Sequence, residues 1–569
     1  MTGTSLVNSS GSALDYSGYS YNQGNQRTSA VRGTTNYLSG ATNSSYANYT
    51  YDPIGQVTSD LAYESGTTTS RMNEQLAYGF DPAENLNYRT NNALIQNFAV
   101  NSDNELTTVT NGGTLTVMDT TTTQNSNTVT VNGSNAVVYG DATFAAVNMP
   151  LTNTYTAIAS DSYGRWATNT VTVSLATNIS FQYDANGNLT NDGSRSFAYD
   201  DENQLIQVLV SNQWMSQFAY DGKMRRRIRQ EYTWTGSGWL QTNAVYYVYD
   251  GNLVIQERDI NFLPTTTYTR GKDLSGSLEG AGGIGGLLAR TARSYVDAPM
   301  AGHSFYHADR NGNITMLINS SQAIVAKYLY DAFGNVLSAS GLLANANLYR
   351  FSSKEAHLNS GLVYYLYRYY DPNLQRWPNQ DPIGDLGRMT PLVRVPWGTQ
   401  GLSLQSGRAV PWQIPDALRE SGEANLYQFV GNNPVNNLDP FGLWTFQVGF
   451  TLGFNFWGWN GSFSTGFSGD TQGNFGGYYT GNLGPATGLG AQGFAGVTVQ
   501  GSNAKCNNNL KGPFAYGSVG GGLGPYGSLD AFGGSSDNGP VFGLGGTVGV
   551  GLGAGGAGGG SLTRIKPLW

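Results

Sequence analysis

The sequence predicts an all-β protein built mainly from stacked β-hairpins. Three observations carry this prediction. Only 12% of the 569 residues are charged, whereas glycine, asparagine, threonine, serine and tyrosine are abundant, which is typical of β-rich chains with many tight turns. A short aromatic–aspartate unit recurs through the first three quarters of the chain. After Leu443 the chain becomes glycine-rich. The length exceeds that of one compact core, so about two to four structural units are expected.

The recurring unit is an aromatic pair, an aspartate, two spacers, glycine or asparagine, and then an aliphatic residue. In the copy YLYDAFGNVL, Tyr328, Tyr330 and Val336 supply alternating strand positions, and DAFGN forms the turn. Asp331 is expected to cap this turn through its side chain, and Gly334 to take the left-handed conformation. Each hairpin has an aromatic face that it cannot bury alone, so neighbouring hairpins must stack into a twisted sheet. Further copies begin at Tyr49, Tyr78, Ala99 (weaker), Phe181, Phe197, Phe218, Tyr247 and Tyr306.

These repeats predict one continuous, curved antiparallel sheet over residues 180–443, without a conventional solid core. Too few repeats are present to close a shell, so a partly open, spiralling wrap is expected. One stretch drops the repeat pattern for alternating threonine and valine with regular turn residues, which indicates a β-sandwich insert. The expected domains are 1–111 (repeats, starting within repeat-like sequence as in a truncated piece), 112–178 (insert), 179–345 (repeats), 346–443 (a distinct closing segment) and 444–569 (glycine-rich).

The last 126 residues contain 37 of the 77 glycines. They open with the strictly alternating stretch WTFQVGFTLGFNFWGW, which predicts a β-strand. They lack the histidine, glutamate and lysine clusters that nuclease or ADP-ribosylating effectors need. Two interpretations stay open, a membrane-active barrel and an inert tail. The charged residues of this segment are Asp470, Lys505, Lys511, Asp530, Asp537, Arg564 and Lys566.

Charge and composition exclude several classes of function. The formal net charge of −8 gives no support for nucleic-acid binding. The basic run KMRRRIR from Lys223 to Arg229 alternates along an expected strand and is interpreted as solvated or ion-paired. A single cysteine, Cys506, rules out internal disulfides and cysteine-based metal cages. The first residues have no signal-peptide pattern, and no apolar run reaches the roughly 18 residues of a membrane helix.

Residues for metal, cofactor or phosphate chemistry are scarce. His303 and His307 lie four residues apart in strand-like sequence, unlike a helical zinc pair, and His357 stands alone. The glycine-rich GAGGIGG at Gly280 lacks the strand–helix context and the Lys-Ser/Thr of a phosphate loop. No cofactor and no metal are therefore expected.

The Asp-Pro turns at the end of the repeats need a further explanation. The stretch RYYDPNLQRWPNQDPIG starts at Arg368, and NNPVNNLDPFGL ends at Leu443, where the composition changes. In an Asp-Pro-x-Gly turn, proline sets φ at the second position and glycine accepts a positive φ. Together with the repeats and GKDLSGSLEGAGGIGGLLAR from Gly271, these motifs resemble the RHS/YD-repeat family. The resemblance covers about residues 45–110 and 180–443, and the closing segment resembles the RHS-associated core, its most specific part.

The resemblance implies a long β-sheet that spirals into a hollow shell and encloses a C-terminal toxin or effector polypeptide, as in polymorphic toxins. It also implies a self-cleaving site like that of an aspartyl protease. Matched motif to motif, its catalytic residues are Arg368, Asp381 and Asp439, and the bond cut is Leu443–Trp444. Two carboxylates that share a proton can act as base on water and as acid on the carbonyl oxygen.

The alternative is that the aspartates only close turns, as expected for Asp331, Asp184 and Asp371. The chain also departs from the family pattern. Gln375-Arg376-Trp377 stands where relatives usually have Gly-Arg-Phe, and residues 385–424 form an insertion. This insertion is either a tolerated surface loop or one that separates the two carboxylates.

Two classes of function follow. The first is a bacterial shell protein that releases its own C-terminal segment by autoproteolysis, with toxin-complex or secretion partners. The second is a cell-surface or adhesion protein with purely structural repeats, able to contact carbohydrate or a cell surface. Both place the chain outside the cell or on its surface, by an export route that the sequence does not identify. Neither gives the shell a nucleic-acid partner.

Overall fold

The computed structural model is all-β, which confirms the predicted fold class. It divides into two compact units, Met1–Gln380 with Gln405–Asp439, and Asp381–Leu404 with Pro440–Trp569. Helices in the described part are short 3-10 turns, η2 (Phe351–Ser353) and η3 (Val430–Asn432). None of the described helices has the length and apolarity of a membrane span. The structure describes residues 3–35, 42–121, 128–293, 302–382, 425–442, 445–456, 459–469, 475–487, 492–502, 512–536 and 539–567.

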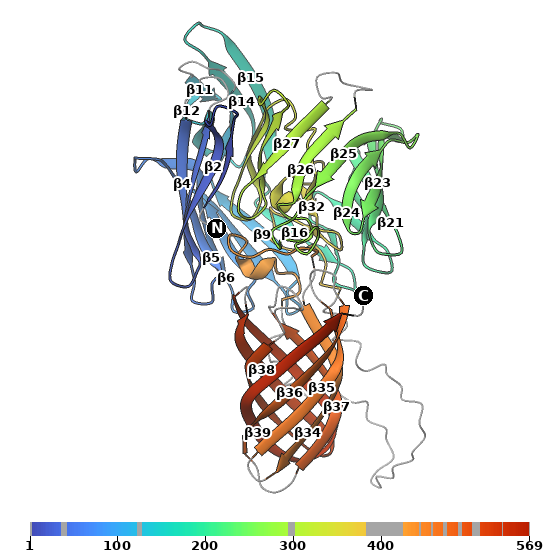
Figure 1. The fold of residues 1–569 in the computed structure, drawn as a ribbon. Helices are drawn as coiled ribbons and strands as arrows, with labels where there is room; N and C mark the ends of the chain where they lie inside the picture. The colour runs from blue at the N-terminus through green and yellow to red at the C-terminus, as the bar shows by residue number, and fades with distance from the viewer. Residues whose placement is uncertain are drawn as a thin grey trace. The chain divides into compact units, whose positions relative to one another are not determined.

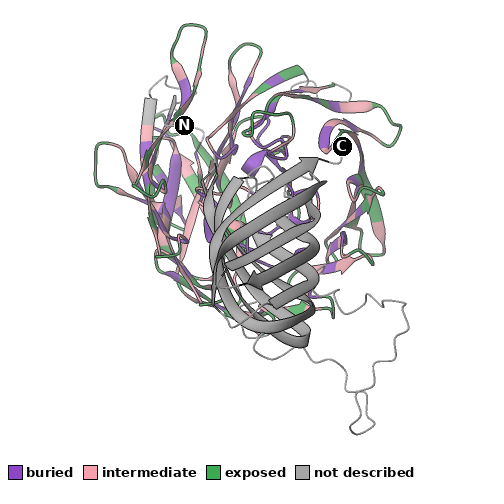
Figure 2. Cartoon of the chain, turned by 60° about the horizontal axis from the view of Figure 1, so that its bottom comes forward, coloured by how far each residue is buried: buried purple, intermediate pink, exposed green. Residues whose placement is uncertain are grey.

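The first sheet of the first unit has ten antiparallel strands, nine of which pair in chain order. The last position is taken by β16, which pairs with β9 across the insert that separates them in sequence. Buried and exposed residues alternate along β8. Figure 2 shows buried, intermediate and exposed residues interspersed along the described strands. The strands are β1 (Gly3–Val7), β2 (Ala13–Tyr21), β3 (Arg27–Thr35), β4 (Thr42–Tyr51), β5 (Val57–Glu64), β6 (Ser70–Phe80), β7 (Leu86–Asn91), β8 (Leu94–Val100), β9 (Leu106–Gly113) and β16 (Asn178–Ser180).

The second sheet has fourteen antiparallel strands in strict chain order. The prediction of one continuous sheet over residues 180–443 is right up to Ser340 and wrong beyond it, because the sheet ends with β30. The strands are β17 (Gln182–Tyr183), β18 (Leu189–Asn191), β19 (Ser196–Tyr199), β20 (Leu205–Val210), β21 (Trp214–Tyr220), β22 (Arg226–Trp234), β23 (Trp239–Asp250), β24 (Leu253–Arg258), β25 (Pro264–Arg270), β26 (Leu287–Ala292), β27 (Gly302–Ala308), β28 (Ile314–Asn319), β29 (Ile324–Tyr330) and β30 (Val336–Ser340).

In most repeats the aspartate closes the turn by accepting backbone hydrogen bonds. The copy at Tyr247 is an exception, because its Asp250 pairs with Leu253 between two strands. The Oδ1 atom of Asp331 accepts hydrogen bonds from the backbone N–H groups of Phe333 and Asn335, both at 2.9 Å. Gly334 has φ +94°, so both turn predictions are confirmed. Asp184 makes the same pair of bonds, as predicted for a turn residue. The turn is therefore specified within about five residues, because side chain and backbone satisfy each other locally.

The part of the closing segment that belongs to the first unit, residues 346–380 and 425–439 where described, packs against both sheets and gives this unit a solid interior. Its small sheet consists of β31 (Glu355–His357), β32 (Leu362–Tyr364) and β33 (Tyr369–Tyr370). Trp377 is fully buried among aromatic rings, with the centroid of Phe429 5.4 Å from its own. Other residues of the segment join apolar clusters with strands of the first sheet (Val435) and the second sheet (Tyr349). This core was not predicted, because the segment has no strand-like alternation from which it could be assigned.

The free ends of the two sheets also contact each other. Leu14 of β2 packs against Met316 and Ile318 of β28. The Oδ2 atom of Asp15 lies 2.9 Å from Nδ1 of His307 on β27. These contacts join side chains rather than strand backbones, so the two sheets meet without merging into one ladder.

The insert between β9 and β16 forms a six-stranded antiparallel sheet of its own. Val129, Val131, Phe144 and Tyr155 form its apolar cluster, to which residues of all six strands contribute. The strands pair in the order β10-β13-β12-β11-β14-β15, so neighbours in space are not always neighbours in sequence. They are β10 (Leu115–Thr120), β11 (Thr128–Val131), β12 (Ser134–Val138), β13 (Thr143–Met149), β14 (Thr152–Ser160) and β15 (Trp166–Ser174).

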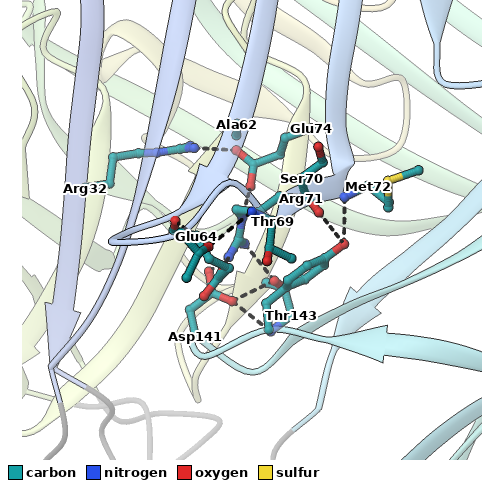
Figure 3. A network of polar contacts seen from close by, with 12 residues as sticks. Arg32, Ala62, Glu64, Thr69, Ser70, Arg71, Met72, Glu74, Asp141 and Thr143 are labelled. Atoms are coloured by element: carbon teal, nitrogen blue, oxygen red, sulfur yellow. Dashed lines mark hydrogen bonds and ion pairs between the residues drawn. The ribbon is translucent and has the colours of Figure 1, made fainter.

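Arg71 of β6 ties the insert to the first sheet (Figure 3). Its guanidinium donates to Oε1 of Glu74 at 2.6 Å, to Oδ2 of Asp141 at 2.8 Å and to Oγ1 of Thr143 at 2.8 Å. Burial raises the pKa of Asp141, but the charge of Arg71 and the bonds from Thr143 outweigh it and lower the pKa to about 2. The carboxylate therefore stays ionised because a buried cation faces it.

The second unit contains one sheet, whose strand pairing closes on itself because β36 also pairs with β39 (Figure 1). Its first strand covers the alternating stretch, which confirms that this stretch is a strand. The strands β34 and β35 pair antiparallel with Phe456 opposite Trp459, and β38 and β39 pair with Ser536 opposite Gly539. The strands are β34 (Thr445–Phe456), β35 (Trp459–Gly469), β36 (Phe475–Thr487), β37 (Gln492–Ser502), β38 (Gly512–Ser536) and β39 (Gly539–Pro567).

The turn geometry predicts that Gly334→Ala destabilises the protein more than Gly164→Ala. Both glycines have a positive φ, which costs an alanine about 1–2 kcal/mol. A Cβ at Gly334 would also lie 2.7 Å from ring atoms of Phe351, whereas at Gly164 it would meet nothing within 4 Å. We expect a loss of about 2–5 kcal/mol in the free energy of unfolding for Gly334→Ala, measured by urea denaturation. Equal losses in the two variants would contradict the close packing at Phe351.

Arg71→Met is expected to lower the free energy of unfolding by about 3–5 kcal/mol, because it leaves buried carboxylates without their cation. Arg165, which pairs with Asp161 in the insert, has a side chain that is 70% exposed and provides the matched control. Arg165→Met should change stability less, because Arg165 is exposed and the buried carboxylate of Asp161 still accepts hydrogen bonds from the backbone N–H groups of Tyr163 and Arg165. Thermal or chemical unfolding of both variants at pH 7 tests the difference. Similar unfolding curves would rule out a structural role for the Arg71 network.

Asp60 of β5 should make stability depend on pH. Burial, together with Glu74 and Asp331, raises its pKa from 3.8 to about 7, although Arg32 opposes the shift. A raised pKa means that the folded state holds the proton more tightly. The contribution of the Asp60 proton to the free energy of unfolding is therefore complete below about pH 4 and is lost as the pH rises to 7.

Asp60→Asn keeps an oxygen that can accept from the backbone N–H of Ala332, which Asp60 binds at 3.0 Å. We expect this variant to match the wild type near pH 4 and to exceed its free energy of unfolding at pH 8 by on the order of 3 kcal/mol. Asp201→Asn, at an exposed turn, is the control and should show no such gain. Urea denaturation at both pH values is the measurement, and a gain that is equal at both would refute the buried-proton explanation.

Candidate functional site

The three residues predicted to be catalytic are all buried. The exposed fraction is 2% for Arg368, 0% for Asp381 and 8% for Asp439. Arg368 and Asp439 belong to the first compact unit and Asp381 to the second, so their surroundings are described one by one. Both residues of the predicted cleaved bond, Leu443 and Trp444, lie outside the described residues, as does the insertion 385–424.

Arg368 is fixed by the turn that joins β32 to β33. Leu366 takes a positive φ of 80°, and the backbone N–H of Tyr365 donates to the carbonyl of Arg368 at 2.9 Å. The guanidinium lies over the ring of Trp377, 4.2 Å from its centroid, and donates to the carbonyl of Leu426 at 3.1 Å. A cation held in this way keeps its position when charge develops nearby.

Asp439 is the last residue of the first unit and lies within the electrostatic reach of Lys354. Burial lowers the pKa of Lys354 to about 7, and the charge of Asp439 opposes the shift. The Nζ atom of Lys354 donates to the carbonyl of Gly282 at 2.8 Å and lies 5.5 Å from the ring centroid of Tyr365. Near neutral pH, this lysine can therefore switch between a charged and a neutral form beside a buried carboxylate.

Lys354 was not predicted to belong to the site. It stands in the mostly polar stretch from Arg350 to His357, which carries no signal for a buried charge. Its closeness to Asp439, 85 positions later in the chain, arises only when the closing segment folds back on itself.

Asp371 closes a turn, as predicted. Its Oδ1 atom accepts hydrogen bonds from the backbone N–H groups of Asn373 at 2.9 Å and Leu374 at 3.0 Å. Its Oδ2 atom also accepts from Arg195 at 2.6 Å, which joins the closing segment to the second sheet.

The basic run is ion-paired, as one of its two interpretations predicted. Arg226 and Arg229 of β22 point inward and bind the carboxylate of Glu355 at 2.5 and 3.0 Å. The guanidinium of Arg226 also lies between the rings of Tyr247 and Tyr364, 4.6 and 4.4 Å from their centroids. These charges hold the closing segment against the second sheet.

A cavity of about 830 Å³ lies in the first unit between the two sheets and the closing segment. Its volume falls in the range of sites for small molecules. Within the described residues, no group of three or more histidine, cysteine, aspartate or glutamate side chains is arranged to hold a metal ion. The lining includes Arg89, Phe98, Arg195, Tyr330, His357 and Ser360.

Comparison with known proteins finds partial relatives. No family model matches the chain. It is 28% identical over 276 residues to the tRNA3(Ser)-specific nuclease WapA of Bacillus spizizenii, a match covering 47% of this chain and 9% of that protein. It is 25% identical over 278 residues to the double-stranded DNA deaminase toxin A of Burkholderia cenocepacia, covering 47% of this chain and 17% of that toxin.

Among solved structures, the chain resembles the crystal structure of TcdB2-TccC3-Cdc42 at 16% identity, with a TM-score of 0.35. That match covers 78% of this chain and 21% of the other. Because the matched regions make up less than a fifth of the WapA nuclease and of the deaminase toxin, the activities of those proteins do not pass directly to this chain.

Proposed function

We propose that this protein is an RHS/YD-repeat shell protein of the polymorphic-toxin type that cuts its own chain after Leu443 and so releases its C-terminal unit. The observation that carries the proposal is the position of Asp439. This buried carboxylate ends the first compact unit and lies four residues before Leu443. The similarity of about half the chain to proteins named as a nuclease and a toxin supports the same class.

The proposed cut is a hydrolysis with an aspartate pair as acid and base. One carboxylate of Asp381 and Asp439 takes a proton from water while the water oxygen bonds to the carbonyl carbon of Leu443, and the other, still protonated, donates its proton to the carbonyl oxygen. Collapse of the intermediate breaks the peptide C–N bond; the proton taken from water passes to the leaving amine of Trp444, and a hydroxyl proton of the intermediate returns to the second carboxylate. The two pKa values must differ, because neighbouring carboxylates resist double ionisation.

Two cations support this chemistry in the proposal. Arg368, held on the ring of Trp377, stabilises the developing oxyanion or the ionised carboxylate. Lys354, with a pKa of about 7, favours the ionised form of Asp439 when it is protonated. Mildly acidic conditions, in which Lys354 carries its charge, should therefore favour Asp439 as the base.

The shell is proposed to hold the C-terminal segment before release. A cavity of about 830 Å³ is much smaller than a segment of 126 residues, so a closed container would need partner subunits or additional repeats. Toxin-complex or secretion partners would supply them, which places the protein outside the cell or on its surface.

Self-cleavage is tested with Asp381→Asn and Asp439→Asn. Purified wild-type protein should separate on a denaturing gel into a large and a small fragment, with masses that sum to 60.9 kDa, and the small one should begin at Trp444. Both variants should stay whole, because an amide cannot exchange the proton that the mechanism moves.

Asp184→Asn is the matched control. Asparagine also closes this kind of turn, so the control should cut like the wild type. Circular dichroism should show the same β content in all four proteins. If the wild type stays whole between pH 5 and 8, or if the two active-site variants still cut, the proposal fails and purely structural repeats of a surface or adhesion protein become the better account.

A further inference from the structure

Ser360, His357 and Glu231 form a hydrogen-bonded chain in the first unit. The Oγ atom of Ser360 lies 2.6 Å from Nδ1 of His357, and Nε2 of His357 lies 3.1 Å from Oε1 of Glu231. Ser360 and His357 belong to the closing segment, whereas Glu231 lies on β22 of the second sheet. A hydroxyl, an imidazole and a carboxylate in this order match the arrangement that activates a serine nucleophile.

The surroundings of His357 hold its ring in one position. The rings of Trp214 and Phe218 meet it edge-on, with centroids 6.3 and 5.4 Å away. Glu231 is held in turn, because its Oε2 atom accepts from Ser216 Oγ at 2.5 Å and from Asn359 Nδ2 at 3.2 Å. An imidazole oriented by a fixed carboxylate keeps one tautomer.

The charges favour a neutral imidazole that can act as a base. Burial lowers the pKa of His357 below its ordinary 6.5, helped by Arg229 and Arg226, although Glu231 opposes the shift. Burial raises the pKa of Glu231, but the bonds from His357 and Ser216 and the charge of Arg229 outweigh it, so the carboxyl stays ionised at neutral pH. With Nε2–H donating to Glu231, Nδ1 is free to accept the proton of Ser360.

Ser360 and His357 face the large cavity. Ser360 and His357 both line the cavity of about 830 Å³, whereas Glu231 is not among its lining residues. The nucleophile and the base therefore face the space where a small molecule fits, and the carboxylate lies behind them. Turn closure alone accounts for part of this geometry, since the N–H of Gly361 donates to the carbonyl of His357 at 2.8 Å. It does not require the contact with Glu231, which is 126 positions away in the chain.

We propose that Ser360 is a nucleophile, with His357 as its base and Glu231 as the positioning residue, and that the site reacts with small carboxylic esters that enter the cavity. Oγ of Ser360 forms a bond to the ester carbonyl carbon while its proton passes to Nδ1 of His357. The bond to the leaving alkoxide breaks, and His357 returns the proton to that oxygen. Water from the solvent then cleaves the acyl-serine in the same way and releases the carboxylic acid. The proposal is independent of self-cleavage after Leu443.

A small phosphorofluoridate, diisopropyl fluorophosphate, tests the nucleophile directly. The serine oxygen displaces fluoride at phosphorus and His357 takes the proton, so one label should be added per chain and should map to Ser360 by peptide mass spectrometry. Ser360→Ala should abolish the label. Ser194→Ala, at a serine that lines the same cavity, should label like the wild type.

The rate of labelling at Ser360 tests the roles of Glu231 and His357. Glu231→Gln should slow labelling at least tenfold without removing Ser360. The wild-type rate should be flat above about pH 6.5 and fall below it as His357 is protonated. Circular dichroism and thermal melting of each variant show whether it is folded. Folded wild-type protein that takes no label, a label that maps elsewhere, or full labelling of Ser360→Ala would overturn the proposal. So would an unchanged rate and pH profile in folded Glu231→Gln.

Discussion

The constraint on which this structure depends is that a single layer of β-hairpins cannot bury its own inner face. Each repeat places aromatic and aliphatic side chains on that face, and the neighbouring hairpins only extend it. Cover must come from another part of the chain. Leu362, Tyr364 and Tyr369 of the closing segment enter one cluster with Phe197 and Phe218 of the second sheet. The segment is therefore the core of the first unit as well as its end.

A segment that covers a sheet must take one defined position on it. In this protein, buried ion pairs define that position. An apolar face accepts many positions of an apolar partner, whereas an arginine in the interior tolerates few. Arg226 forms an ion pair with Glu355 and contacts two tyrosine rings, and Arg195 forms an ion pair with Asp371. Each ion pair therefore fixes the position of the closing segment on the second sheet. Arg71 does the same for the insert. Although the chain has few charged residues, several of them are buried and form ion pairs between its parts.

The same interior shifts the proton affinities of groups that chemistry could use. Removal from water lowers the pKa of Lys354 and of His357 and raises that of Asp60. The shifts bring the pKa values of Lys354 and Asp60 to about 7, where each group can exchange a proton, and they keep the imidazole of His357 neutral. Asp439 and Ser360, the residues proposed for cleavage and for ester chemistry, each lie beside one of the two shifted bases. Both therefore depend on the closing segment being in place.

The sequence by itself determined what is local in this protein. The turn at Asp331 and Gly334, the paired strands around it and the strand over Thr445–Phe456 follow from contacts within a few residues, which a pattern can display. Arg368, Asp381 and Asp439 could be singled out only through motif resemblance, and their burial is seen only in the structure. The end of the sheet at Ser340, the closeness of Lys354 to Asp439 and the contact of His357 with Glu231 were decided by the tertiary structure. These two contacts join residues that are 85 and 126 positions apart in the chain. Their distances depend on which hairpins the closing segment covers, and no repeat pattern encodes that choice.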